Sequence, residues 1–331
     1  MAAAASLTPV DRLDVLILVD NATDGLSTTP ANVETEFSSV TRRGLRASSG
    51  RCLCCAVHGL SCLITAERGG TRHAVLFDSG PEDYAFERNT TRLGADLGSV
   101  ESIVLSHGHW DHSGAMFLAL HAIRARNGGR PVPYYAHPGM FHARAIRLPN
   151  GNVRLMDDVP GVDDLTAHGA RVVCTTEPQL FLDDMFYVSG EIPRHTAYER
   201  GVPNQVRRTA DGKDWEPDEL VTDERWLAVN LAGRGLVVFS ACSHAGIVNV
   251  LSHARATYPD VPIHAVVGGL HLSGPQEQAI PQTVEAMKAF SPAMIAAGHC
   301  TGWRAMSALA GAFGDKVLAP LAVGKRYTLA G

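Results

Sequence analysis

The segment Ser106-His107-Gly108-His109-Trp110-Asp111-His112 constrains this chain most, because it places three imidazoles and a carboxylate within six residues. It follows the apolar residues 103–105, which are typical of a short buried strand. Neutral imidazole suits zinc and iron, and a carboxylate adds a negatively charged ligand. The spacing of His107 and His109 lets both rings reach one metal ion, while Asp111 and His112 can reach a second. We therefore predict a metal site on a loop at the carboxyl end of a strand.

Strand and helix patterns alternate along the chain and predict an α/β fold. Strands are expected at residues 13–19, 56–65, 73–77, 103–105, 132–135, 226–229, 235–240, 263–267 and 294–297, and helices at 86–93, 116–126, 246–256 and 278–289. Strands followed by helices occur in both halves, which favours two halves packed as a four-layer αββα sandwich. Residues 24–50 are rich in Ser, Thr and Gly and predict a loop near the site.

Residues 138–225 lack this regularity and hold only two candidate strands, 171–175 and 185–188. Their polarity favours a cap or lid over the site rather than a second folded domain. A layered α/β fold can accommodate 331 residues in one unit. We therefore expect residues 1–331 to form a single domain with a cap insertion at about 138–225.

Composition restricts which binding partners and which cellular compartment are expected. The net charge is −5 and no Lys/Arg-rich block occurs, so nucleic acid is not an expected partner. The start of the chain lacks a basic region, and residues 15–19 are too short an apolar stretch for a span, so neither a signal peptide nor membrane insertion is expected. An odd number of cysteines, seven, argues against a disulfide scaffold and favours a cytoplasmic protein. The expected partner is a small-molecule substrate, and a homo-oligomer is compatible with the sequence.

Four cysteines cluster in the first quarter of the chain: Cys52, Cys54, Cys55 and Cys62. Their spacing, C-x-C-C-x6-C, fits no structural zinc site. We interpret them as buried free thiols on a strand.

Further motifs accompany the histidine-rich loop. They are His58-Gly59-Leu60-Ser61, Leu76-Phe77-Asp78-Ser79-Gly80, Leu93-Gly94-Ala95-Asp96-Leu97, Gly190-Glu191-Ile192-Pro193-Arg194, Ala241-Cys242-Ser243-His244-Ala245-Gly246, Gly268-Gly269-Leu270-His271-Leu272 and Gly298-His299-Cys300-Thr301-Gly302. Together, over residues 14–315, they resemble the metallo-β-lactamase-fold superfamily. Within it they resemble the metal-dependent hydrolases called dihydropteroate-synthase-like or ribofuranosylaminobenzene-phosphate-synthase-like.

This resemblance implies two divalent metal ions, with zinc expected and manganese or iron as alternatives. His107, His109 and one distal group would hold the first ion, and Asp111, His112 and His299 the second. In the wider superfamily an Asp that ends a later strand bridges both ions. Here Cys242 stands at that position, and His244 follows two residues later. Both are predicted ligands, although a site with one tightly and one loosely held ion is an alternative, and Glu191 and His195 are weaker ligand candidates.

Four residues complete the predicted site. Asp78 ends a strand and is expected either to accept the outer N–H of a ligand histidine or to cap the Ser79-Gly80 turn. His58 is expected to face the substrate. Arg194 is the cationic residue within these motifs that could bind a phosphate or carboxylate. His271, in Gly-Gly-x-His, is a candidate ligand or substrate contact, with a structural role as the alternative.

The predicted activity is metal-dependent hydrolysis of an ester, lactone or phosphoester. A bound divalent ion lowers the pKa of its water from about 15.7 toward 7, and Asp111 is expected to orient the resulting hydroxide or carry its proton. A pterin-type synthase is a second hypothesis, and Arg194, Arg200, Arg207 and Arg208 could furnish its basic pocket. A mononuclear iron oxygenase of a thiol or persulfide is the third, and a binding protein without turnover is the fourth.

Overall fold

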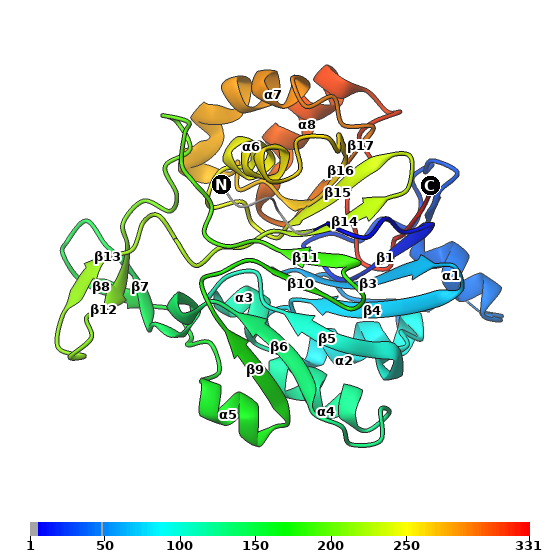
Figure 1. Cartoon of the computed structure of the whole chain (residues 1–331), viewed down its shortest axis with the longest axis horizontal. Helices are drawn as coiled ribbons and strands as arrows, with labels where there is room; N and C mark the ends of the chain where they lie inside the picture. The colour runs from blue at the N-terminus through cyan, green and yellow to red at the C-terminus, as the bar shows by residue number, and fades with distance from the viewer. Residues whose placement is uncertain (1–5, 48) are drawn as a thin grey trace.

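The structure is a computed structural model that describes residues 6–47 and 49–331. Two large sheets face one another, and helices cover the outer face of each, so that the layers follow the order α, β, β, α (Figure 1). This confirms the predicted fold class. The start of the chain, on which the signal-peptide expectation depends, lies outside the described residues. Among the described residues, no helix combines the length and the apolar character that a membrane span requires.

The first sheet has eight strands. In spatial order they are β2 (Val33–Glu34), β18 (Arg326–Ala330), β1 (Arg12–Val19), β3 (Ser61–Arg68), β4 (Thr71–Phe77), β5 (Val100–Val104), β6 (Val132–Ala136) and β9 (Ala170–Cys174). The strands from β4 to β9 run parallel. Helices α2 (Asp83–Leu93), α4 (Met116–Arg124) and α5 (Val162–Ala167) cover its outer face. The short helix α1 (Glu36–Arg42) precedes β3, with Thr35 as its N-cap.

The second sheet has six strands. They are β10 (Gln179–Phe181), β11 (Phe186–Val188), β14 (Leu227–Leu231), β15 (Gly235–Ser240), β16 (Ile263–Gly269) and β17 (Met294–Gly298). Strands β15, β16 and β17 are parallel. Helices α6 (Ile247–Thr257), α7 (Ile280–Lys288) and α8 (Trp303–Phe313) cover the outer face of this sheet.

The central core lies between the two sheets. Leu13, Val15 and Ile17 of β1 face the second sheet, whereas Leu16 and Leu18 face the helices on the other side. This explains why β1 is apolar at nearly every position, since both of its faces are covered. Across the core the rings of Phe77 and Phe239 meet edge to face, with their centroids 6.3 Å apart.

Residues 138–225 contribute to three different sheets. Strand β9 joins the first sheet, and β10 and β11 join the second. A third, four-stranded sheet consists of β13 (Trp215–Pro217), β12 (Gln205–Arg208), β7 (Arg144–Arg147) and β8 (Val153–Leu155). It projects from one end of the sandwich (Figure 1). Part of the range 138–225 therefore belongs to the two large sheets, and only the remainder lies outside them. That this remainder acts as a lid is still a prediction.

The structure also corrects several local expectations. Residues 24–50 contain β2 and α1 as well as loop, and the chain ends with α8 and β18, which the sequence patterns did not indicate. Of the four clustered cysteines, only Cys62 lies on a strand, and the other three lie in the loop before β3. All seven cysteines of the chain are free thiols.

Candidate metal centre

The predicted site residues follow the carboxyl ends of neighbouring strands. His107 comes after β5, Cys242 after β15, His299 after β17 and His271 after β16. Because the carboxyl ends of parallel strands meet at one edge of a sheet, both sheets present these side chains at the same end of the sandwich. A short helix, α3 (Trp110–Ser113), then directs Asp111 and His112 back toward the strand ends.

The backbone is strained around this edge. Asp78, Ser243, His271 and His299 all have φ between 45° and 59°, in the left-handed region that side chains with a Cβ rarely adopt. Gly108 is required for a different reason, since a Cβ there would collide with the Arg144 guanidinium and the backbone of Met140. Strained residues persist where surrounding contacts hold them, which is common at functional sites.

Three imidazoles form the first group of donors. The Nε2 atom of His107 lies 3.0 Å from Nδ1 of His109 and 3.0 Å from Nε2 of His244. All three side chains are buried. The structure thus brings His244, which lies more than 130 residues further along the chain, to the distal position beside His107 and His109.

A carboxylate, two imidazoles and a thiol form the second group. The Sγ atom of Cys242 lies 3.2 Å from Nε2 of His112 and 3.1 Å from Nε2 of His299. The Oδ2 atom of Asp111 lies 3.6 Å and 3.4 Å from the same two nitrogens. The two groups adjoin, because the rings of His107 and His112 have centroids 4.4 Å apart.

Most of these histidines are oriented through their outer ring nitrogens. The acceptors are Ser106 Oγ for His107 Nδ1 (2.9 Å), Gln205 Oε1 for His109 Nε2 (2.8 Å), Asp78 Oδ2 for His112 Nδ1 (2.7 Å) and Asn21 Oδ1 for His299 Nδ1 (3.0 Å). A proton on each outer nitrogen leaves a lone pair on the inner one, which is the tautomer that a metal ligand needs. The outer nitrogen of His244 is buried and has no hydrogen-bond partner among the described residues.

The donor set fits divalent cations. Burial lowers the pKa of His107 and His244 well below the ordinary value and lowers the pKa of His109 to about 4, so these rings are uncharged at neutral pH. Three uncharged imidazoles with their lone pairs converging at about 3 Å leave a donor pocket that a cation would complete. Imidazole, carboxylate and thiolate together suit zinc and related transition metals.

Asp78 is placed as one of its two predicted roles requires. It is fully buried, and besides His112 it accepts from the backbone N–H and the hydroxyl of Ser106. It therefore links the strand end of β4 to the histidine-rich loop. His58 lies at the outer edge, with its side chain 56% exposed and its Nε2 3.3 Å from Asp111 Oδ2.

The predicted substrate contacts occupy different surroundings. Arg194 donates to the backbone carbonyls of His244 and Leu220, which ties its guanidinium to the loop beside the first donor group. The ring of His271 packs against that of His244, with centroids 4.3 Å apart, and lines a small cavity behind it. A substrate contact remains a prediction for both residues.

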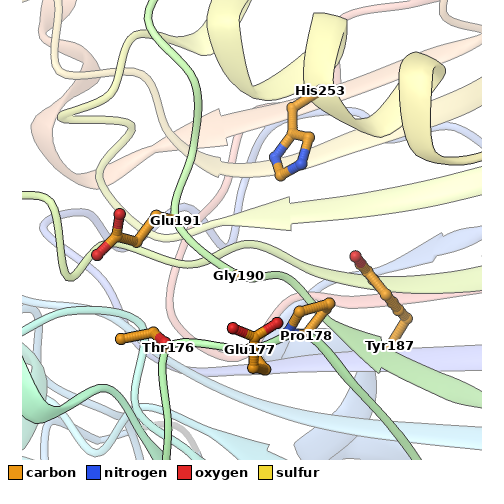
Figure 2. A pocket seen from close by; sticks show the side chains of 7 residues that line it. All are labelled: Thr176, Glu177, Pro178, Tyr187, Gly190, Glu191 and His253. Atoms are coloured by element: carbon orange, nitrogen blue, oxygen red, sulfur yellow. The ribbon is translucent and has the colours of Figure 1, made fainter. Parts of the chain in front are cut away.

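Glu191 and His195, the weaker ligand candidates, belong to neither donor group. Figure 2 shows Glu191 on the wall of a separate depression, with Glu177, Tyr187 and His253 of α6. His195 is exposed, and its backbone N–H donates to Asn249. The clustered cysteines also belong to neither donor group.

Several residues that support the site carry no motif that could have revealed them. Asn21 accepts from His299 and donates to Nδ1 of His58 and to the backbone carbonyl of His299. Glu224, fully buried, accepts from the backbone N–H groups of His244 and Ala245. Gln205 comes from the third sheet. Each is an ordinary polar residue whose importance follows only from long-range packing.

The chain is similar to known proteins in sequence and in structure. The Metallo-beta-lactamase superfamily profile matches residues 58–299, which is more than half of the chain. In Methanocaldococcus jannaschii, the 7,8-dihydropterin-6-methyl-4-(beta-D-ribofuranosyl)-aminobenzene-5'-phosphate synthase is 29% identical over 250 residues, covering 75% of this chain and 82% of that protein. An uncharacterised protein of the same organism is 28% identical over 254 residues, covering 77% of this chain and 88% of its own length.

Solved structures share the fold. Tm1679, described as a metal-dependent hydrolase of the beta-lactamase superfamily, has a TM-score of 0.69 and 20% identity, covering 96% of this chain and all of that one. Unliganded yeast PDE1 has a TM-score of 0.54 and 10% identity, covering 97% of this chain and all of that one. The profile match, together with the αββα layers, shows that the chain belongs to the metallo-beta-lactamase superfamily.

Proposed function

We propose that the chain is a hydrolase that cleaves an ester, lactone or phosphoester of a small molecule, with a divalent ion, expected to be zinc, in each donor group. The observation that carries the proposal is the juxtaposition of three converging imidazoles with a second, carboxylate-containing group. When bound, such ions polarise a carbonyl or phosphoryl oxygen and activate water. The seven ligands in this proposal are His107, His109, His244, Asp111, His112, Cys242 and His299.

Asp111 and His58 are the proposed proton carriers. In the neutral ring of His58, Nδ1 accepts from Asn21 over 3.2 Å and Nε2, which faces Asp111, carries the proton. A general acid needs the charged imidazolium form, and the hydrogen bond to the Asp111 carboxylate, 3.3 Å from Nε2, favours that form because it raises the pKa of His58. Because the His58 side chain is half exposed, this N–H can reach a leaving group at the entrance of the site. His58 would then act as general acid while Asp111 orients the attacking water.

Cys242 stands at the sequence position where the wider superfamily has its bridging carboxylate, and it is proposed as a ligand of the second group. Its thiol is buried and lies about equally far from His112 and His299, whereas the first donor group is made up of imidazoles alone. A thiolate contributes one negative charge, as a carboxylate does, but binds through a single sulfur atom. Because the short contacts of this sulfur are to His112 and His299, we place Cys242 in the second group.

Turnover of simple probes tests the proposal. Zinc-loaded protein is assayed with p-nitrophenyl acetate, a γ-lactone and bis(p-nitrophenyl) phosphate, beside the His107→Ala and Asp111→Asn variants. We expect at least one probe class to be hydrolysed, with a loss of about 10³-fold or more in both variants. Rates equal to those of the His107→Ala variant for every probe would overturn the hydrolase proposal.

A second candidate is a pterin-type synthase, because a relative 29% identical to this chain bears that description. In such a reaction an arylamine nitrogen attacks the carbon that carries the diphosphate, the C–O bond breaks, and diphosphate leaves as the amine loses a proton. The test is diphosphate release that requires both a pterin diphosphate and an aminobenzoate-like amine. Release that needs only the diphosphate and water would favour hydrolysis.

A further inference from the structure

A small cavity behind His244 contains an unusual set of buried polar atoms. The Nδ1 atoms of His244 and His271 and the hydroxyl of Thr283 on α7 are all buried and without hydrogen-bond partners among the described residues. All three residues line one cavity of about 20 Å³. Buried polar groups are nearly always hydrogen bonded, so three unpaired ones around one cavity point to a bound group.

The cavity is rich in donors and poor in free acceptors. With Nε2 of His244 directed at the first donor group, its Nδ1 carries the proton and must donate. The hydroxyl of Thr283 can donate, and so can Nδ1 of His271 in one tautomer. Glu199 also lines the cavity, but its two oxygens already accept from the backbone N–H groups of Val248 and Asn249 and from the hydroxyl of Thr196. Glu199 is not hydrogen bonded to either ring or to the Thr283 hydroxyl, which leaves these groups open to an external acceptor.

A surface groove adjoins the cavity. Cavity and groove share Tyr198, Arg200, Gln276 and Ala279, and the groove has a volume of about 680 Å³. Arg200 is exposed and donates through Nε to a backbone carbonyl, but it has no carboxylate partner among the described residues. By contrast, Arg207 pairs with Glu216, and Arg208 stacks on Trp215. Arg200 is therefore the arginine of this region that is placed to attract an anion into the groove.

We propose that this groove and cavity bind a small carboxylate, with one carboxylate oxygen accepting from His244 Nδ1 and Thr283 and the rest of the ligand lying in the groove beside Arg200. A volume of about 20 Å³ holds one oxygen-sized group, which matches a single carboxylate oxygen rather than a whole molecule. The bound oxygen would supply His244 with the outer-nitrogen partner that His107, His109, His112 and His299 already have. The assignment of the carboxylate to a substrate or to a separate effector rests on the proposed function. The proposal that a carboxylate binds here does not depend on that function.

Acetate is the probe, with histidine-ring ¹⁵N NMR of the zinc-loaded protein as the readout and chloride at the same ionic strength as the reference. We expect saturable shifts at His244 Nδ1, and acetate affinity about tenfold weaker in Thr283→Val and in Arg200→Gln, with unchanged zinc content. Thr166→Val and Arg234→Gln, which replace exposed residues remote from the groove, are the matched controls and should bind acetate like the parent protein. Because the readout is binding, failure of hydrolysis does not affect it.

The proposal would be overturned if acetate produced no saturable shift at His244, or if Thr283→Val and Arg200→Gln both bound acetate as tightly as the parent protein. Either result would indicate that water occupies the cavity. If a hydrolysed probe is found, the inhibition pattern distinguishes the two sources of the carboxylate. Competitive inhibition by acetate assigns the site to the substrate, and non-competitive inhibition assigns it to an effector.

Discussion

Gln205 Oε1 lies 2.8 Å from Nε2 of His109, so a residue of the projecting third sheet fixes the ring of a proposed metal ligand that precedes it by 96 residues. Gln205 is itself held, because its Nε2 donates to the carboxylate of Asp218 over 3.2 Å. The third sheet therefore contributes to the proposed centre without supplying a ligand.

Replacing Gln205 should weaken metal binding. The Gln205→Leu variant leaves the outer N–H of His109 buried without an acceptor, and loss of such a partner typically lowers metal affinity by about 10- to 100-fold. Competition with a chromophoric zinc chelator measures the affinity of the first site. Asn150→Leu, which removes an exposed loop amide, is the control and should bind zinc like the wild type. Equal affinity in Gln205→Leu would contradict the orienting role.

Replacing His58 should separate proton transfer from metal binding. His58 is proposed to donate a proton and is not among the proposed ligands, so His58→Gln should retain full zinc content. We expect kcat to fall by about 10²- to 10⁴-fold, the usual contribution of a general acid. The steady-state rate of the probe hydrolysed by the wild type provides the measurement. A variant that loses zinc together with activity would place His58 among the ligands instead.

Gly108 should not tolerate a side chain. A Cβ at this position meets the backbone of Met140 and the buried Arg144 guanidinium, neither of which can move freely. Overpacking of this kind typically costs about 1–3 kcal/mol. Urea unfolding of Gly108→Ala should show that loss, whereas Gly311→Ala, at an open position of α8, should be neutral or slightly stabilising. Two variants of equal stability would show that the loop can move to accept the methyl group.

His73 should make stability depend on pH. Its ring nitrogens lie 2.8 Å from a carboxylate oxygen of Glu101 and 3.0 Å from one of Asp183. Burial lowers the pKa of His73, but hydrogen bonds to both carboxylates and Coulomb attraction to them outweigh burial and raise this pKa above 6.5. A raised pKa means that the protonated ring stabilises the fold fully below pH 6.5, and that this contribution is lost as pH rises through the folded-state pKa. The free energy of unfolding of wild type minus His73→Gln should therefore be larger at pH 5.5 than at pH 9.

The control for that comparison is His121→Gln, which replaces an exposed histidine of α4 that has no carboxylate partner among the described residues. Its difference from the wild type should be the same at both pH values. A His73→Gln difference that stays constant, or grows toward pH 9, would contradict the assigned ion pairs.

The sequence predicted the layers because its strongest patterns are local. Continuous apolar runs such as β1 mark strands covered on both faces. Helix α2, which ends at Gly94, and helix α6, which begins after Gly246, follow their strands at short spacing. The sequence pattern does not indicate the third sheet, because its strands have three or four residues each and alternate weakly. The sequence predicts a loop for residues 24–50 because α1 is only seven residues long and largely polar.

The candidate metal centre likewise combines residues that local sequence patterns reveal with residues that only the fold brings together. The seven proposed ligands stand in dense motifs at strand ends, and the family resemblance that these motifs carry is what names them as ligands. Asn21, Gln205 and Glu224 occur singly, and the structure alone brings them to the histidines. The left-handed backbone at Asp78, His271 and His299 is likewise invisible in sequence, because none of these residues is a glycine.

Metal content per chain tests the central claim most directly. Protein purified without added metal or chelator is analysed by plasma mass spectrometry, beside His244→Ala and Cys242→Ala. We predict about two metal ions per wild-type chain, either two zinc ions or one zinc and one manganese. Each variant should lose one ion: His244→Ala the ion of the first donor group, and Cys242→Ala the ion of the second. One iron per chain would contradict the two-ion hydrolase and favour thiol oxygenation. A protein that holds no metal even after zinc is added would contradict the metal centre itself.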